Sequence, residues 1–159
     1  MPYSYNQISD HLFQGAFPPP GAGLKKAGFD VLVLCAAEHQ RADMYPGLTV
    51  IKAGGDDDAR YLRMLLFIQK WKQAAAIVVE HVRQGHNVLV TCMAGQNRSG
   101  LVVGLALVEL MGLTGKEAVE YIRGRRALAL NNETFAQYLV DNFPGQTEEM
   151  KEDKNDPLP

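Results

Sequence analysis

The stretch of residues 88–100 reads Val-Leu-Val-Thr-Cys-Met-Ala-Gly-Gln-Asn-Arg-Ser-Gly and gives the strongest indication of the fold. It begins as a short apolar run, passes through a turn at Gly95 and leads into an apolar segment that starts near Leu101. A short apolar run followed by a glycine-bearing turn and a helical segment predicts a buried strand that feeds a helix N-terminus. Because backbone N–H groups and the helix dipole meet there, such a junction favours a bound anion.

Two reactive side chains flank this turn, because Cys92 ends the predicted strand and Arg98 lies just before the predicted helix. A helix N-terminus and an arginine both favour the thiolate form of a nearby cysteine, which is the nucleophilic form. The guanidinium of Arg98 offers a planar fork that matches two phosphate oxygens. The spacing Cys-x5-Arg, followed by Ser99, therefore predicts a phosphate cradle with a nucleophile at its base. The alternative is a core cysteine on a buried strand with an unrelated surface arginine.

Residues 92–99 resemble the signature loop of the cysteine-dependent protein tyrosine phosphatase superfamily, and the small size of the chain is similar to its dual-specificity-like branch. The resemblance covers roughly residues 8–143, but only residues 88–100 are strongly specific. It implies that Cys92 is the nucleophile, that Arg98 binds the phosphoryl oxygens and that the hydroxyl of Ser99 helps the thiolate leave. It also implies that the loop binds substrate through Met93, Ala94, Gly95, Gln96, Asn97 and Arg98.

One position departs from the family pattern, because Thr91 stands where the family usually has a histidine. In the family this histidine supports the reactive cysteine through hydrogen bonds of the loop. A threonine offers a hydroxyl in its place but no positive charge. We therefore expect a working nucleophile with a less acidic thiol, which the pH dependence of iodoacetamide labelling at Cys92 tests.

The composition is that of one domain in a reducing compartment. The 159 residues are 47% hydrophobic and 21% charged, which is enough for a single core. The net charge of -2 gives no electrostatic reason to expect bulk nucleic-acid binding. Because Cys35 and Cys92 do not make a disulfide framework, and a thiolate needs reducing conditions, we expect a cytoplasmic location. No signal-peptide or membrane-spanning pattern is expected either.

The rest of the chain alternates predicted strands with predicted helices. Strands are expected near residues 8–14, 29–34, 48–53 and 87–92, and helices near residues 24–27, 59–84, 101–111 and 114–126. The long helix has room for a break, and Asn131 or Asn132 caps a last helix. This pattern predicts an α/β fold with a central, mostly parallel sheet flanked by helices and a phosphate-binding loop between a strand and a helix. We expect one catalytic domain over residues 1–143 and a disordered tail over residues 144–159.

Breaking a phosphate ester also needs a proton for the leaving oxygen, and a carboxylic acid is a usual donor. In the resembling family, an aspartate in a loop after a strand supplies it. Residues 54–58 form that loop here and contain Asp56, Asp57 and Asp58. Asp58 is placed to cap the next helix, so Asp56 and Asp57 remain, and Asp57 is favoured because the loop's glycines leave it room. Alternatively, all three merely favour the dipole of the helix that follows.

The resemblance implies a phosphatase that hydrolyses phosphate monoesters through a phosphocysteine intermediate. Phosphotyrosine in proteins is the expected substrate, with phosphoserine and phosphothreonine as further candidates. The four histidines lack the spacing of a ligand set, so no metal or other cofactor is expected. We expect a monomer that binds a phosphorylated protein or another phosphomonoester and binds no membrane.

Two other functions stay open. Residues 95–100 also resemble the loop of RNA 5′-phosphatases of the same superfamily, although the chain lacks a strong basic surplus. A non-catalytic phosphate-binding module is the other possibility, and Thr91 is its only support. Turnover separates an enzyme from a binding module, and comparison of phosphopeptides with 5′-triphosphorylated RNA separates the two enzymes.

Overall fold

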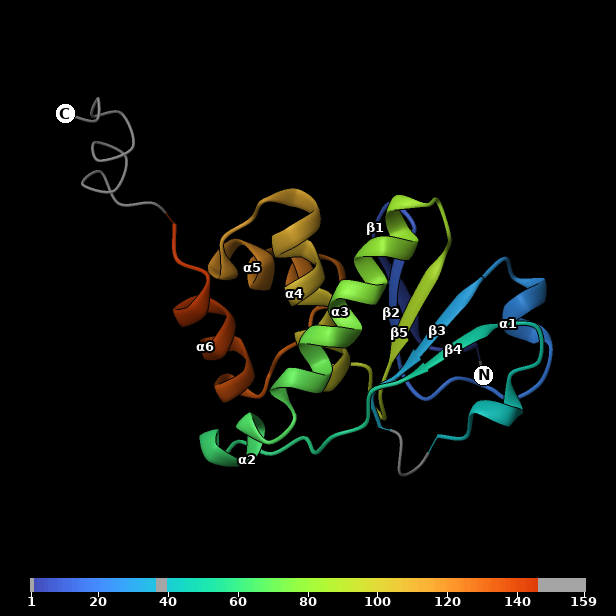
Figure 1. The fold of residues 1–159 in the computed structure, drawn as a ribbon, viewed down its shortest axis with the longest axis horizontal. Helices are drawn as coiled ribbons and strands as arrows, with labels where there is room; N and C mark the ends of the chain where they lie inside the picture. Colours follow the sequence, from blue (N-terminus) through green and yellow to red (C-terminus); the bar gives the residue numbers. More distant parts are fainter. Residues whose placement is uncertain (1, 37–39, 146–159) are drawn as a thin grey trace.

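Strands and helices alternate along the chain, and the strands assemble into one sheet (Figure 1). The computed structural model describes residues 2–36 and 40–145. Within them the strands are β1 (Tyr5–Ser9), β2 (Leu12–Gly15), β3 (Val31–Leu34), β4 (Thr49–Lys52) and β5 (Val88–Thr91). The helices are α1 (Gly23–Lys26), α2 (Tyr61–Leu65), α3 (Ile68–Arg83), α4 (Arg98–Met111), α5 (Gly115–Arg125) and α6 (Glu133–Asn142), with a 3-10 turn η2 (Ala42–Met44).

The sheet has the strand order β1-β2-β5-β3-β4. β2, β5, β3 and β4 run parallel, and β1 pairs antiparallel with β2 at one edge. The predicted central, mostly parallel sheet flanked by helices is confirmed. β5 is the middle strand, so the residues that follow it leave the sheet at its centre, beyond the carboxyl ends of the parallel strands.

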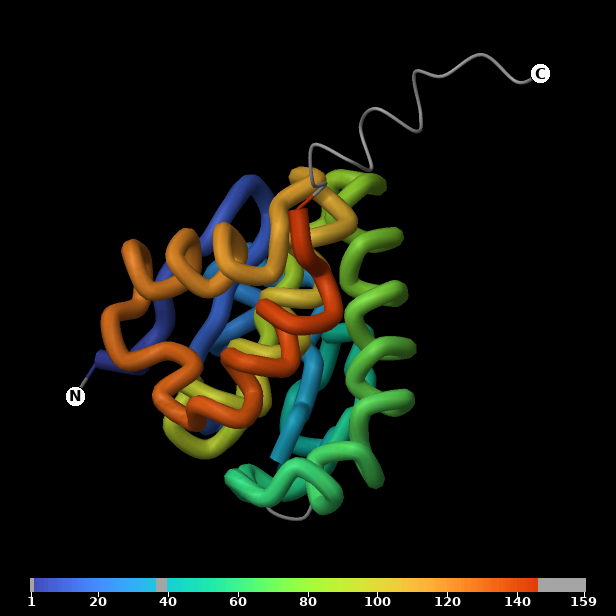
Figure 2. The backbone as a smooth tube through the Cα atoms, turned by 90° about the vertical axis from the view of Figure 1, so that its left-hand side faces the viewer, coloured from blue at the N-terminus to red at the C-terminus, as the bar shows by residue number. Residues whose placement is uncertain are grey.

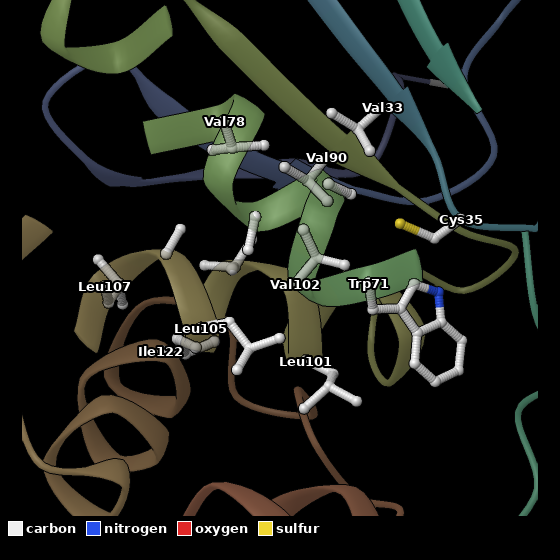
Figure 3. Packing of buried hydrophobic residues seen from close by; sticks show 14 of the residues in the cluster. Val33, Cys35, Trp71, Val78, Val90, Leu101, Val102, Leu105, Leu107 and Ile122 are labelled. Atoms are coloured by element: carbon white, nitrogen blue, oxygen red, sulfur yellow. The ribbon is translucent and has the colours of Figure 1, made fainter. Parts of the chain in front are cut away.

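Successive side chains of the central strands point to opposite faces of the sheet, and the side chains on both faces are buried. Val33 and Val90 face a large core that also contains Trp71 and the apolar side of α4, as Figure 3 shows. Leu32 and Leu89 face the opposite side and pack with the residues around α1. Continuous apolar runs such as those of β3 and β5 are typical of parallel strands covered on both faces.

The helices on the large core form two layers (Figure 2). α3 and α4 contact each other and the sheet, while α5 and α6 pack against α4. This position explains why α4 is buried along most of its length. Among the described residues, no single helix is long and apolar enough to cross a membrane. α4 and α5 taken together have the length and composition of a span, but their axes are bent by 116° relative to each other.

Two predicted boundaries are wrong, and a third element breaks where its length left room for a break. The expected first strand over residues 8–14 is a hairpin of β1 and β2, because His11 adopts a left-handed backbone with φ 63° and reverses the chain. The expected long helix over residues 59–84 does contain the break that its length allowed, at Leu66 and Phe67, which divides it into α2 and α3. α4 begins at Arg98, three residues before the predicted start, so it takes in the end of the signature loop.

Two predicted helix starts are confirmed. Thr114 and Glu117 form a reciprocal capping box at the start of α5. The side chain of Asn132 accepts hydrogen bonds from the backbone N–H groups of Thr134 and Phe135, and so it caps α6. The predicted disordered tail lies outside the described residues, apart from residues 144 and 145.

Candidate active site

The signature loop joins the end of β5 to the start of α4. It reverses at Gly95, whose backbone has φ +70°. A Cβ atom on this residue would lie 2.4 Å from the backbone carbon of Gly15 and 2.5 Å from the backbone nitrogen of Ala16. Only glycine fits this turn, since it combines a left-handed conformation with close contact to another backbone segment.

Cys92 lies at the base of this loop and is 2% exposed. Its Sγ is 3.2 Å from the Oγ of Ser99, and the backbone N–H of Ser99 donates to the same sulfur at 3.5 Å. Ser99 is fully buried in the first turn of α4, and Asn97 occupies the N-cap position. Ser99 therefore lies inside α4 and does not cap it. A hydroxyl and an amide of a helix N-terminus face the sulfur, and both stabilise negative charge there.

Arg98 connects the signature loop to the aspartate-bearing loop of residues 54–58, here called the acid loop. The side chain of Arg98 is 8% exposed, and its Nη1 donates to the backbone oxygen of Gly55 at 3.1 Å. The indole of Trp71 holds the same loop by donating to the backbone oxygen of Ala53 at 2.9 Å. A Cβ on Gly55 would lie 2.5 Å from the Trp71 ring, so the loop packs directly on this side chain.

Asp57 is the acid-loop aspartate that contacts the signature loop. Its Oδ2 accepts a hydrogen bond of 2.9 Å from the side-chain amide of Asn97. Its Oδ1 accepts a second bond, also of 2.9 Å, from the side-chain amide of Asn132. Both carboxylate oxygens are thus held by amide donors from two other segments, which fixes the carboxylate at the edge of the loop that carries Arg98.

The other two aspartates of the acid loop each form an ion pair with an arginine. Asp56 pairs with Arg63 at 2.6 Å, and Asp58 pairs with Arg60 at 2.7 Å. Hydrogen bonds from the side chain and backbone of Arg60 lower the pKa of Asp58 to about 2. Asp58 does accept a bond from the backbone N–H two residues on, at 2.8 Å, but α2 begins only after Arg60. The prediction that Asp58 caps this helix is therefore wrong, because its bond closes a turn before the helix.

Thr91 uses its hydroxyl away from the reactive cysteine. The hydroxyl donates to the backbone oxygen of Val33 at 2.9 Å and accepts a 3.1 Å bond from the side-chain amide of Gln40. The other end of that amide accepts from the backbone N–H of Ala36. Thr91 therefore ties β5 to β3 and to the segment that follows β3, in a neutral and fully buried network.

The outer part of the loop is open on one side and braced on the other. Met93 is 43% exposed and Ala94 is also exposed, so these residues form the rim of the site. Arg126 braces the inner side, because its Nε donates to the backbone oxygen of Gly95 at 2.6 Å and its Nη2 to that of Ala94 at 3.2 Å. Because these carbonyls are turned toward Arg126, the amides of the loop are left to face an anion. The side chain of Gln96 accepts a bond from Asn131.

Several of these contacts have no counterpart in the sequence-based predictions. From the sequence, Arg126 is expected only as one of three arginines, with Arg123 and Arg125, at a helix C-terminus, and Asn132 is expected only as a helix cap. Gln14, which contacts the signature loop from β2, was not singled out at all. The sequence feature that could have indicated it is the position of a polar side chain directly after the apolar residues Leu12 and Phe13. Cys35 is a buried free thiol, and burial raises its pKa well above the usual range.

No group of three or more His, Cys, Asp or Glu side chains is arranged to hold a metal ion within residues 2–36 and 40–145.

Comparison with known proteins identifies the family. Residues 19–143 match the family model of the dual specificity phosphatase catalytic domain. The chain is 48% identical over 44 residues to the protein tyrosine phosphatase PRL-1 of Trypanosoma cruzi (strain CL Brener), covering 28% of this chain and 25% of the relative. It is 36% identical over 62 residues to dual specificity protein phosphatase 1 of Arabidopsis thaliana, covering 39% of this chain and 31% of the relative. The matched segments thus span less than a third of the length of these curated relatives.

Solved structures share the fold at low sequence identity. Human DUSP28 superposes with a TM-score of 0.74 and 23% identity, covering 89% of this chain and 96% of that chain. A mouse putative dual specificity phosphatase complexed with zinc tungstate gives a TM-score of 0.72 and 23% identity, covering 89% of each chain. Since the family model covers most of the chain, the protein belongs to the dual specificity phosphatase catalytic domain family, within the cysteine-dependent protein tyrosine phosphatase superfamily.

Proposed function

We propose that the protein hydrolyses phosphate monoesters of phosphorylated proteins through a phosphocysteine intermediate formed on Cys92. The observation that carries this proposal is the approach of Cys92 Sγ to Ser99 Oγ, at 3.2 Å, at the N-terminus of the helix that begins with the buried Arg98. A nucleophile, a cationic fork and an anion-binding helix end therefore converge on one point.

In the first step, the thiolate of Cys92 attacks the phosphorus and the bond from phosphorus to the leaving oxygen breaks. Arg98 and the loop amides bind the three remaining phosphoryl oxygens, where negative charge is concentrated. Asp57 gives its proton to the leaving oxygen, so the product is a neutral alcohol or phenol. Its contact with Asn97 supports this role over Asp56 and Asp58, whose carboxylates are engaged by arginines.

In the second step, water attacks the phosphocysteine and the bond from sulfur to phosphorus breaks. The electron pair of that bond returns to the sulfur, and the carboxylate of Asp57 accepts a proton from the attacking water. The hydroxyl of Ser99 donates a hydrogen bond to the departing thiolate. Inorganic phosphate then leaves, and the enzyme returns to its starting state.

Protein substrates are favoured by the relatives, two of which carry the names protein tyrosine phosphatase and dual specificity protein phosphatase. The exposed rim at Met93 and Ala94 also supports a substrate that approaches from an open surface. Phosphotyrosine is the proposed main substrate, with phosphoserine and phosphothreonine as further ones. A cytoplasmic location is part of the same proposal, because the thiolate needs a reducing environment.

The test is hydrolysis of para-nitrophenyl phosphate across pH in excess EDTA, by wild type and by Cys92→Ser. We expect metal-independent turnover that falls by about 10⁴-fold or more in the variant, because the nucleophile is lost. Labelled phosphate trapped on Cys92 in acid-quenched wild type would identify the intermediate. Turnover by wild type that survives in Cys92→Ser would overturn the mechanism. Higher kcat/KM on 5′-triphosphorylated RNA than on phosphopeptides would overturn the protein-substrate assignment.

A further inference from the structure

Gln14 is a buried polar residue on β2 at a position where the strand faces the core. It has no exposed surface, and Leu12, two residues earlier on the same face, is also fully buried in the main core. An apolar side chain would be the ordinary occupant of such a position. The side chain of Gln14 instead reaches under the signature loop, which lies more than eighty residues further along the chain.

The amide nitrogen of Gln14 donates to two groups of the loop. It lies 3.0 Å from the backbone oxygen of Gly95 and 3.2 Å from the Oγ of Ser99, with the backbone oxygen of Gln96 further away at 3.5 Å. A carbonyl oxygen only accepts hydrogen bonds, so the nitrogen end of the amide has to face the loop. The orientation of the amide is therefore determined by Gly95.

This orientation determines where the proton of the Ser99 hydroxyl goes. Because the Oγ of Ser99 accepts from Gln14, its single O–H is left to donate elsewhere. The sulfur of Cys92 is 3.2 Å away on the other side. When Cys92 is a thiolate it can only accept, so the three groups form a chain in which Gln14 donates to Ser99 and Ser99 donates to Cys92.

The oxygen end of the Gln14 amide is in an unfavourable environment. The Oε1 of Gln14 is buried, and no part of the chain that the structure describes donates a hydrogen bond to it. A buried acceptor without a donor destabilises a fold. Both loop acceptors have other partners, since Arg126 also donates to Gly95 and Cys92 contacts Ser99. Stability therefore does not explain the presence of Gln14, whereas orientation of Ser99 does.

We propose that Gln14 is a positioning residue for the second chemical step, because it directs the hydroxyl of Ser99 toward the sulfur of Cys92. The inference rests on the proposed function. In that step the bond from sulfur to phosphorus breaks and the electron pair returns to the sulfur, where the Ser99 hydroxyl stabilises it. Without Gln14 the hydroxyl is free to rotate, and the thiolate leaves more slowly.

The test compares Gln14→Leu with wild type by rapid-quench kinetics on para-nitrophenyl phosphate. We expect kcat to fall by about threefold to tenfold, the usual effect of one misdirected hydrogen bond. The rate of the initial burst of nitrophenolate should change less than about twofold on the same grounds, so phosphocysteine accumulates. The melting temperature should stay equal or rise, because the buried acceptor is removed. Gln14→Met provides the same test if the leucine variant does not fold.

A double-mutant cycle with Ser99→Ala separates positioning from general structural support. If Gln14 acts through Ser99, then Gln14→Leu has no further effect on kcat in the Ser99→Ala background. Gln7→Leu on the neighbouring strand is the matched control, since Gln7 is exposed and its side chain donates to the backbone oxygen of Ser9, outside the signature loop.

Three results would overturn the inference. These are an unchanged kcat in Gln14→Leu, an equal loss in both steps together with a lower melting temperature, or a full additional loss in the Ser99→Ala background. Failure of the proposed function itself looks different, because wild type would then trap no phosphate on Cys92.

Discussion

The signature loop and the acid loop bring the two halves of the proposed chemistry together, but they are held in place in different ways. The signature loop is one continuous strand, turn and helix, and its reactive residues are almost completely buried. The acid loop lies between β4 and α2, carries three consecutive aspartates, and is held by side chains from other segments of the chain. Trp71, Arg98 and Asn132 each supply one of these contacts.

The proposed nucleophile and the proposed proton donor therefore have different structural requirements. A phosphate cradle needs backbone amides at one helix end, and a short stretch of sequence can encode them. A proton donor has to reach a leaving group outside that cradle, so it comes from a second loop whose position depends on tertiary contacts. Changes in the acid loop should therefore reduce proton transfer while leaving formation of the cradle intact.

The largest expected effect in the acid loop is that of Asp57→Ala. We expect kcat to fall by about 10²- to 10³-fold on substrates with a poor leaving group, because proton donation is lost. The loss should be smaller on para-nitrophenyl phosphate, whose leaving group needs less protonation. Asp56→Ala and Asp58→Ala are matched controls from the same loop and should lose less than about threefold, in the range of an exposed ion pair. A large loss in either control, with Asp57→Ala unaffected, would reassign the proton donor.

A medium effect is expected for Asn132→Asp. Aspartate caps a helix as well as asparagine does, so α6 should keep its N-cap and the melting temperature should change little. The amide donor to Asp57 is lost, and a second carboxylate takes its place. Because like charges favour the protonated form of Asp57, the basic limb of the kcat/KM profile should move to higher pH. We expect kcat to fall by about tenfold from misplacement of the acid.

Asn142→Asp is the control for Asn132→Asp, since it adds the same charge at the other end of α6. An unshifted pH profile in Asn132→Asp, or an equal shift in Asn142→Asp, would show that Asn132 does not act on Asp57.

The smallest effect is expected at Asp58 and concerns stability rather than catalysis. The folded-state pKa of Asp58 is about 2, below its usual value of 3.8, so its contribution to stability is present above pH 4 and is lost as the pH falls from 4 to 2. Asp58→Asn should therefore lower the melting temperature by at most about 3 °C at pH 6, since the pair with Arg60 lies at the surface. The difference from wild type should disappear near pH 2. A difference that grows on acidification would contradict this sign.

Regular, local features of the fold could be predicted from the sequence. The capping box at Thr114, the cap at Asn132 and the strand–loop–helix around Cys92 are encoded within a few neighbouring residues. The hairpin of β1 and β2 could not be predicted, because the residue that turns the chain in the left-handed conformation is His11 and not the glycine that usually marks such a turn. The break between α2 and α3 also lacks a glycine or proline signal. Phe67, at the break, packs against Trp71 beneath the acid loop, so tertiary packing accounts for it.

The α/β fold could be predicted from the alternation of strand and helix patterns along the chain, and the phosphate-binding loop with its candidate pair Cys92 and Arg98 from the spacing within one short stretch. The tertiary structure was needed to show which aspartate contacts that loop, what Thr91 binds and how Gln14 reaches Ser99. Those contacts join residues between thirty and ninety positions apart, and hydrogen bonds of this kind depend on distances and angles that exist only after the strands have paired.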